Sequence, residues 1–472
     1  ATAAHRGRVR RRRHLMLRGR EVRDLEDDVL DPDLLGQEGV RADAQGALLA
    51  AVTARRTGRM GDIVATIQAE QDEVIRAPLA GAVVVQGGPG TGKTAVALHR
   101  AAYLLYTHRE RLARSGVLIV GPSTAFMRYI ERVLPSLGET GVVMASLGTL
   151  MPGVQAGPER DLDAAAVKGR LEMAQVIAHA VAQRQRLLAQ PRRLMIEGTA
   201  VKLKPAAVRR ARDRARATGK PHNEARATFV KIILRELAEK LGEELDASSG
   251  NAIDRSYLVE DLRQAPEVRR AVNLLWLPLS AETLVRQLFA KRRYLDSAFR
   301  HLSPAQRDQL ERPAAAALTV SDVPLLDEAA ERLGTLEDAG VRIRTGEAER
   351  AKATEMAERA LYNMSQALED VGVDGVVSAS DLTEFNEEQE HRMTAAEAAT
   401  SDRTWAYGHV VVDEAQELTP MQWRVLMRRC PMKSFTVVGD IAQAGSASAA
   451  ASWGEALAPF VGERFSLEEL TV

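Results

Sequence analysis

Apolar positions along the chain follow two patterns. Continuous runs stand at AVVVQ (82–86), VLIV (117–120), VVV (410–412) and FTVV (435–438). Such runs are typical of strands buried on both faces of a parallel sheet. After the first run, apolar residues recur at helical spacing, at Ala97, Leu98, Ala101, Leu104 and Leu105. The alternation of buried strand, loop and helix predicts a doubly wound α/β domain.

The middle of the chain has a different pattern. Residues 156–404 are rich in Ala, Arg, Glu and Leu, contain loop-marking prolines, and lack the continuous apolar runs of parallel strands. We therefore expect a mainly α-helical insertion that interrupts the α/β domain. The predicted domains are residues 1–44, 45–155, 156–404 and 405–472. The second and fourth segments form the two halves of the α/β domain, and the first is packed on it.

The first predicted segment is basic and alternating. Residues 8–30 alternate on both sides of Arg18-Gly19-Arg20, which predicts a β-hairpin. Its arginines either contact nucleic acid or form a solvated strand face. Residues 41–77 have the pattern of a helix.

Charge is balanced overall but segregated locally. The chain has 64 basic and 64 acidic residues, so net charge does not indicate a partner. Residues 202–220 carry eight cations and one acid, Asp213, which predicts a basic helix. This helix either binds an anionic partner or has a solvated face. Its cations are Lys202, Lys204, Arg209, Arg210, Arg212, Arg214, Arg216 and Lys220. Residues 361–390 contain acids and no Lys or Arg, which predicts a self-repelling loop.

Cysteine content and hydropathy indicate the compartment. The single cysteine, Cys430, excludes a disulfide framework and fits a reducing environment. No apolar run approaches the roughly 18 residues of a membrane span. We expect a cytoplasmic protein with no membrane partner.

A glycine-rich loop follows the first apolar run. GGPGTGKT matches the phosphate-binding pattern G-x-x-x-x-G-K-[ST]. Glycine permits the backbone to curl so that successive N–H groups face phosphate oxygens, and the next helix adds its dipole. The pattern predicts an ATP site with Mg²⁺, formed by Gly87, Gly88, Pro89, Gly90, Thr91, Gly92, Lys93 and Thr94. Lys93 is expected to reach the β- and γ-phosphates, and Thr94 to bind Mg²⁺.

The third apolar run ends in two carboxylates. Asp413 is placed to hold Mg²⁺, and Glu414 suits the general base for the attacking water. Three further residues have two interpretations each. Gln71 either reads the adenine edge or is a solvent-facing helix residue. Asp440 and Gln443 either sense the γ-phosphate or form an ordinary turn after a strand.

These motifs in this order resemble superfamily 1 helicases. The resemblance rests on Gln71, GGPGTGKT (87–94), GPST (121–124), DEAQ (413–416) and VGDIAQ (438–443). It implies a RecA-like P-loop NTPase lobe and ATP hydrolysis with Mg²⁺. Gln416 then couples the ATP state to a second lobe.

Longer stretches resemble the actinobacterial form of the HelD-like proteins, which bind bacterial RNA polymerase. They are ATIQAEQDEVIR (65–76), VLPSLGETG (133–141) and VVDEAQELTPMQWRVLMRR (411–429). This resemblance implies a monomeric factor that clears nucleic acid from stalled RNA polymerase. The acidic segment then enters the polymerase channel, with Asp374 and Asp381 at its tip, or is a solvated spacer.

Two departures from the family qualify the expectation. AGSASAA follows Gln443, where DNA helicases usually place an aromatic that stacks on a base. The resemblance further leads us to expect that the second lobe with its arginine finger, and the N-terminal coiled coil of HelD-like proteins, lie outside this sequence. We expect an internal piece that hydrolyses ATP poorly, because an arginine finger contributes about 10³–10⁵ in rate.

Two other functions remain open at this point. One is a superfamily 1 DNA helicase or translocase in repair, with residues 202–220 tracking phosphates of DNA or RNA. The other is a nucleotide-gated binding module with little hydrolysis.

Overall fold

The computed structural model describes residues 11–18, 21–29, 69–122, 141–249, 254–336, 399, 402–445 and 450–470. β1 (Arg11–Arg18) and β2 (Glu21–Val29) pair antiparallel, which confirms the predicted hairpin. Of the helix expected over residues 41–77, the described part is α3 (Ala69–Arg76). The acidic segment 361–390 lies outside the described residues, with Asp374 and Asp381. No helix in the described parts of the chain is long and apolar enough to cross a membrane.

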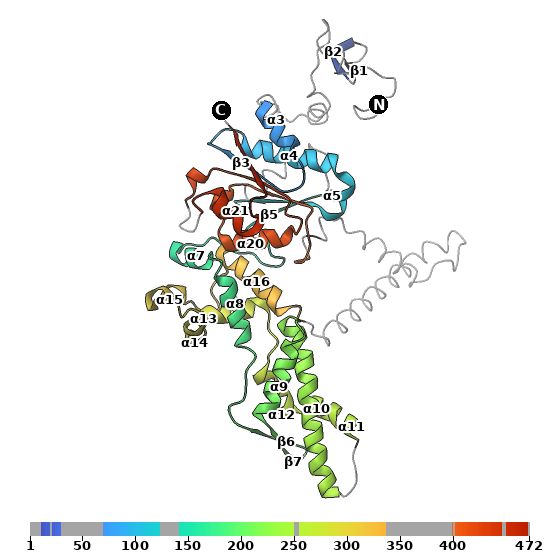
Figure 1. The fold of residues 1–472 in the computed structure, drawn as a ribbon, viewed down its shortest axis with the longest axis vertical. Coiled ribbons are helices and arrows are strands. Elements are labelled where there is room, and N and C mark those ends of the chain that lie inside the picture. Colours follow the sequence, from blue (N-terminus) through green and yellow to red (C-terminus); the bar gives the residue numbers. More distant parts are fainter. Residues whose placement is uncertain are drawn as a thin grey trace, which may run out of the picture.

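A six-stranded parallel sheet forms the centre of the RecA-like lobe (Figure 1). This lobe comprises the described parts of residues 69–146 and 402–470, and it is called the motor lobe after the family that its motifs resemble. Its order is β10–β3–β9–β8–β4–β5, and each neighbouring pair runs parallel. The strands are β3 (Ala82–Gly87), β4 (Val117–Gly121), β5 (Val142–Ser146), β8 (His409–Val412), β9 (Phe435–Gly439) and β10 (Phe465–Leu470). The apolar runs became the four central strands, so the predicted RecA-like α/β lobe is confirmed.

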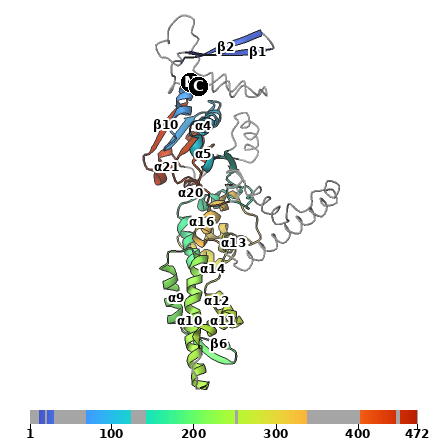
Figure 2. The same ribbon diagram turned by 90° about the vertical axis from the view of Figure 1, so that its right-hand side faces the viewer.

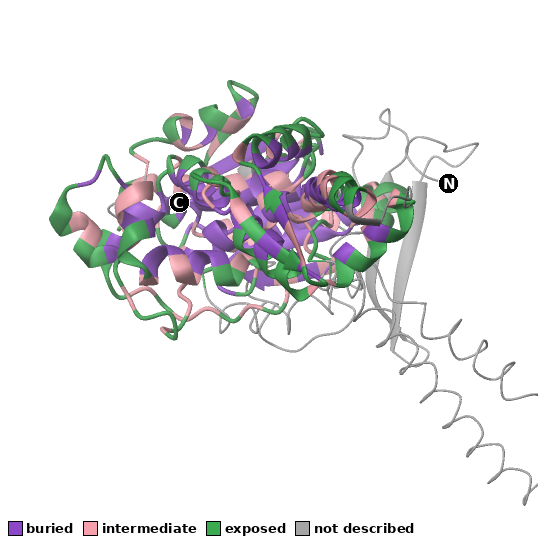
Figure 3. Ribbon diagram, turned by 90° about the horizontal axis from the view of Figure 1, so that it is seen from below, coloured by how far each residue is buried: buried purple, intermediate pink, exposed green. Residues whose placement is uncertain are grey.

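Both faces of the sheet are covered, because successive strand residues point to opposite sides. Val84 and Val412 pack with α20 (Pro420–Arg429) and α21 (Trp453–Val461). Neighbouring residues of the same strands pack on the opposite face against α3, α4 (Lys93–Thr107) and α5 (Arg109–Ser115). The apolar residues that predicted α4 are all buried. Figure 3, a view along the long axis of the molecule, shows buried residues on the inner sides of the elements and exposed residues on the outer turns.

The insertion is the part of the chain between β5 and β8, and its described residues form two apolar cores. The proximal core, next to the motor lobe, is built by α7 (Leu162–Lys168), α8 (Met173–Ala182), α13 (Ala281–Ala290), α14 (Arg292–Ala298), α15 (Pro304–Leu310) and α16 (Val323–Leu333). A short 3₁₀ turn, η3 (Val320–Asp322), precedes α16.

The distal core lies farther from the lobe. It is built by β6 (Arg192–Ile196), β7 (Thr199–Leu203), α9 (Pro205–Arg216), α10 (His222–Ser249), α11 (Arg255–Gln264) and α12 (Pro266–Leu275). Figure 2 shows α9 beside the long α10, with the insertion extending away from the motor lobe.

The β6–β7 hairpin corrects the prediction for the basic stretch. Residues 202–220 are not one helix, because Lys202 lies on β7 and Lys204 is the N-cap of α9. Proline at 205 favours a helix start there, since its fixed φ suits the first helical turn. The hairpin alternates polar and apolar residues, so it contains no continuous apolar run that would predict a strand.

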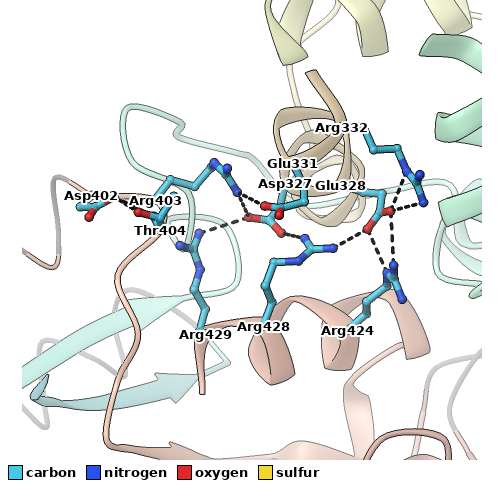
Figure 4. A network of polar contacts seen from close by, with 10 residues as sticks. All are labelled: Asp327, Glu328, Glu331, Arg332, Asp402, Arg403, Thr404, Arg424, Arg428 and Arg429. Atoms are coloured by element: carbon cyan, nitrogen blue, oxygen red, sulfur yellow. Dashed lines mark hydrogen bonds and ion pairs between the residues drawn. The ribbon is translucent and has the colours of Figure 1, made fainter. Parts of the chain in front are cut away.

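Buried ion pairs join the insertion to the motor lobe (Figure 4). Asp327 and Glu328 of α16 are almost fully buried and face arginines of α20. Arg424 and Arg428 reach Glu328 at 2.9 and 2.6 Å, and Arg428 also pairs with Asp327. The Met421 amide donates to the Gly169 carbonyl after α7 at 2.9 Å. The helix that follows the DEAQ motif therefore packs directly on the proximal core.

Candidate nucleotide site

The loop between β3 and α4 has the conformation that its glycines permit. Gly90 and Gly92 have φ of 82° and 80°, in the left-handed region that side chains disfavour. A Cβ at Gly87 would lie 2.7 Å from the hydroxyl oxygen of Thr91. Lys93 Nζ donates to the carbonyls of Gly87 and Gly88 at 2.6 and 2.7 Å. The ammonium group is therefore held over the loop that is predicted to cradle phosphates.

The two halves of the predicted magnesium site meet across the sheet. Thr94 Oγ1 donates to Asp413 Oδ2 at 2.9 Å, although 319 positions separate the two residues. Asp413 is 4% exposed, and burial raises the pKa of its carboxyl group, while the hydrogen bond from Thr94 acts in the opposite direction. A carboxylate and a hydroxyl side by side are oxygen ligands of the kind that Mg²⁺ prefers. These residues fit the cation, and its charge would favour the ionised carboxylate.

The described residues contain no cluster of three or more His, Cys, Asp or Glu side chains that could hold a metal. A magnesium site built on one carboxylate, one hydroxyl and substrate phosphates does not need such a cluster.

Glu414 occupies a strained position beside Asp413. Its φ of 50° lies in the left-handed region, which is uncommon for a residue with a side chain and recurs at functional sites. The Glu414 amide donates to Asp413 Oδ1 at 2.9 Å. Gln416 Nε2 donates to Glu414 Oε2 at 2.6 Å. The turn after β8 therefore fixes the carboxylate that is predicted to act as base.

Asp440 and Gln443 lie at the end of β9, between the ends of β3 and β8. Gln443 Nε2 donates to Asp440 Oδ2 at 2.6 Å, and the Asp440 amide donates to Gln416 Oε1 at 3.1 Å. Hydrogen bonds from Gln443, and then from Gln86, lower the pKa of Asp440. The structure thus brings the predicted residues of β8 and β9 into one connected group.

Gln71 of α3 also lies against the phosphate-binding loop. Its Nε2 donates to the Thr91 carbonyl at 3.2 Å, and a Cβ at Gly92 would lie 3.4 Å from the same nitrogen. Gln71 is half-buried rather than solvent-facing. The structure places Gln71 against the loop, and adenine recognition by this side chain stays a prediction.

Sequence reasoning missed two residues that complete this region. Gln86 is the second-last residue of β3 and directly precedes the glycine-rich loop. The only signal in the sequence was that the apolar run at 82–86 ends in a polar residue. Arg100 of α4 is fully buried and donates to the carbonyls of Val74, Ala77 and Pro78, which anchors the end of α3. Burial lowers the pKa of Arg100 to about 10, and no sequence pattern distinguished it from a surface arginine.

Comparison with known families adds an independent result. The model of the UvrD/REP helicase N-terminal domain matches residues 67–444, which is most of the chain. The chain belongs to the UvrD/REP helicase family. Members of this family are superfamily 1 helicases that hydrolyse ATP with Mg²⁺. No curated protein matched the chain. The matched range includes Gln71, the glycine-rich loop, the DEAQ motif and Gln443.

Proposed function

We propose that this chain is the ATP-binding and ATP-hydrolysing lobe of a superfamily 1 motor. The observation that carries the proposal is the Thr94–Asp413 hydrogen bond, which joins the glycine-rich loop to the DEAQ motif across the sheet. Lys93 supplies a cation to the β- and γ-phosphates, and Glu414 accepts the proton of the attacking water. Thr94 and Asp413 hold Mg²⁺, which neutralises phosphate charge when bound.

We further propose that the motor acts on bacterial RNA polymerase, as a HelD-like factor that clears nucleic acid from the stalled enzyme. The quoted stretches that resemble HelD-like proteins support this assignment. The sequence after Gln443 also lacks a nearby aromatic for base stacking. The described insertion extends away from the lobe, and buried ion pairs attach it to α20. This attachment suits the insertion to transmit a movement of the lobe to a large partner.

A DNA helicase or translocase is the second candidate. The family match favours it, and so do the exposed cations of α9. The two candidates differ in the polymer that stimulates hydrolysis. A DNA translocase hydrolyses ATP faster when DNA is added, whereas a polymerase factor responds to polymerase.

The test uses the intact protein with core RNA polymerase and with single-stranded DNA. We expect the protein to co-elute with polymerase and to displace bound DNA from it when ATP is added. Lys93→Ala serves as the control that cannot use ATP. Strong stimulation of hydrolysis by DNA, without polymerase binding, would establish the helicase instead. Polymerase binding with no ATP turnover would establish a nucleotide-gated binding module.

A further inference from the structure

Two side-chain amides connect three strand ends at the nucleotide site. Gln416, after β8, accepts from the Asp440 amide and donates to Glu414. Gln86, at the end of β3, donates through Nε2 to Asp440 Oδ1 at 2.6 Å. Asp440, after β9, is thus the junction between the two amides.

The orientation of the Gln86 amide is determined by its partners. Its Oε1 accepts from Trp453 Nε1 at 2.8 Å and from the Ile441 amide at 3.1 Å. Both of these groups can only donate, so the oxygen of Gln86 must face them. Its nitrogen then necessarily faces the Asp440 carboxylate. The anchor for this arrangement is Trp453, which is 4% exposed at the start of α21.

The space around the junction is full. A Cβ at Gly439 would lie 2.3 Å from Gln416 Oε1 and 3.0 Å from the ring of Trp453. Asp440 also accepts from the Ala442 amide at 3.1 Å. Asp440 therefore has little freedom to move while Gln86 holds it from the β3 side and Gln416 from the β8 side.

Gln443 is the exposed end of this network. Asp440 takes one N–H of Gln443, which leaves the second N–H for a phosphate oxygen. The carboxylate itself would repel phosphate, so the amide is the group suited to contact a γ-phosphate. The placement of Gln443 therefore depends on the placement of Asp440.

We propose that Gln86 is a positioning residue that lets the site distinguish ATP from ADP, with Trp453 as its anchor. Gln86 holds Asp440, Asp440 orients Gln443, and the same carboxylate residue is tied through Gln416 to Glu414. The proposal rests on the proposed ATP site. The proposal gives β3 the additional role of positioning Asp440 through Gln86. It also implies that the indole of Trp453 responds to binding of the γ-phosphate.

The test measures equilibrium binding of Mg·ATPγS and Mg·ADP to the full chain. Gln86→Met keeps the side-chain length and removes all three hydrogen bonds. We expect it to lower the preference for ATPγS over ADP by about tenfold, with ADP affinity within about threefold of wild type. Gln175→Met, at an exposed position of α8, is the matched control and should leave both affinities unchanged.

Trp453→Phe gives a second route, which also serves if Gln86→Met fails to fold. Trp453→Phe removes the indole donor, so it should also lower the preference for ATPγS over ADP. The double variant Gln86→Met/Trp453→Phe should lower this preference no further than Gln86→Met alone. Trp405→Phe is its control, because the Trp405 indole donates to the Ser115 carbonyl, away from the site. We expect ATPγS, and not ADP, to change tryptophan emission in wild type but not in Trp453→Phe.

The results distinguish failure of the role proposed for Gln86 from failure of the proposed ATP site. If wild type discriminates between the nucleotides and both Gln86→Met and Trp453→Phe discriminate equally well, the positioning role is wrong and the ATP site stands. If wild type binds neither nucleotide, the proposed function is wrong, and the role of Gln86 with it.

Discussion

Buried carboxylates occur in both the motor lobe and the insertion, but their surroundings differ. Burial raises the pKa of Asp413, and the nearby hydrogen bonds do not overcome that effect. Burial also acts to raise the pKa of Glu328, but hydrogen bonds and charges from Arg424 and Arg428 outweigh it and lower the pKa to about 2. The carboxylate of Glu328 already has its cations, whereas that of Asp413 lacks sufficient positive charge. The difference separates a structural ion pair from a group arranged to receive a cation.

The polar residues of the two regions are also organised differently. In the motor lobe, polar side chains from three parallel strands converge at one edge of the sheet. In the insertion, buried polar groups of the described residues pair with each other: Asp322 forms ion pairs with Lys168 at 3.2 Å and with Arg312 at 2.8 Å. The first arrangement is suited to chemistry, and the second to holding an extended body in a defined place.

The largest effect is expected at Lys93 in the motor lobe. Lys93→Ala removes the ammonium that the loop holds at Gly87 and Gly88, so we expect ATP affinity to fall more than about a hundredfold. Isothermal titration with Mg·ATP measures the change. Lys231→Ala, at an exposed position of α10, is the matched control in the insertion. A similar loss of ATP affinity in both variants would contradict the assignment of nucleotide binding to the motor lobe and not to the insertion.

The next effect separates binding from hydrolysis. Glu414→Gln cannot accept the proton of water, so we expect turnover in the intact protein to fall by about 10²–10⁴ with ATP affinity retained. Steady-state phosphate release measures turnover. Glu417→Gln, three residues later in the same turn, is the control and should stay active. Normal turnover in Glu414→Gln would refute the assignment of the base.

The junction between the two regions should be sensitive to charge. Glu328→Gln leaves Arg424 without its carboxylate and leaves Arg428 with Asp327 alone, so we expect a loss of about 3–5 kcal/mol in unfolding free energy. Denaturant unfolding measures it. The exposed Glu260→Gln is the control and should cost less than about 1 kcal/mol.

The same junction predicts a dependence of wild-type stability on acid. The folded pKa of Glu328, about 2, lies below its ordinary value of 4.5. Its contribution is therefore complete above about pH 4.5 and is lost as the pH falls toward 2. A Glu328→Gln variant whose stability fell as steeply as that of wild type over this range would contradict the assignment.

A smaller effect is expected at the exposed face of α9. On α9, Arg210 and Arg212 pair with carboxylates at 3.0 Å, and Arg216 donates to the side-chain oxygen of Gln185. Arg209 and Arg214 are exposed on α9 and form no ion pair with any described residue, and neither does the exposed Lys220 just beyond the helix. If this face binds nucleic acid, changing all three to Gln should weaken DNA binding about tenfold in low salt and much less in high salt. Fluorescence anisotropy at several salt concentrations measures this. A loss that does not depend on salt would indicate a packing role.

The control for the α9 variant removes three positive charges from exposed positions on other helices of the distal part of the insertion. Arg263, Arg269 and Arg270 are exposed on α11 and α12. Changing these three to Gln should leave DNA affinity within about twofold. Equal losses in the two triple variants would mean that overall charge, and not the α9 face, governs binding.

The smallest effect is expected for Asp413→Asn, which should raise stability, whereas Glu328→Gln should lower it. Because the folded pKa of Asp413 is raised, its ionisation costs stability as the pH rises through the ordinary value of 3.8 toward the folded value. Asp413→Asn removes that cost and can still accept from Thr94, so we expect a slightly higher melting temperature at pH 7 without nucleotide or Mg²⁺. Differential scanning calorimetry measures it. A melting temperature lowered as much as in Glu328→Gln would place Asp413 among the structural ion pairs.

Sequence alone determined the central strands, the glycine-rich loop and the positions of Lys93, Asp413 and Glu414. These features are local: a run such as VVV at 410–412 records burial on both faces, and a loop such as GGPGTGKT records backbone conformation. The β6–β7 hairpin and β10 were missed because alternating or polar strands depend on what covers them. The basic stretch was assigned to one helix for the same reason.

Only the tertiary structure decided which of these residues meet. β9 lies between β3 and β8 in the sheet, so Gln86 contacts Asp440, which is 354 positions away. Likewise, α16 lies against α20, so Asp327 and Glu328 became partners of arginines about a hundred positions away. Nothing in either local stretch specifies such a neighbour, because a strand or helix encodes its own periodicity and burial but not the order in which elements pack. The single sequence therefore supplied the reactive groups, and the order of strands and helices supplied their connections.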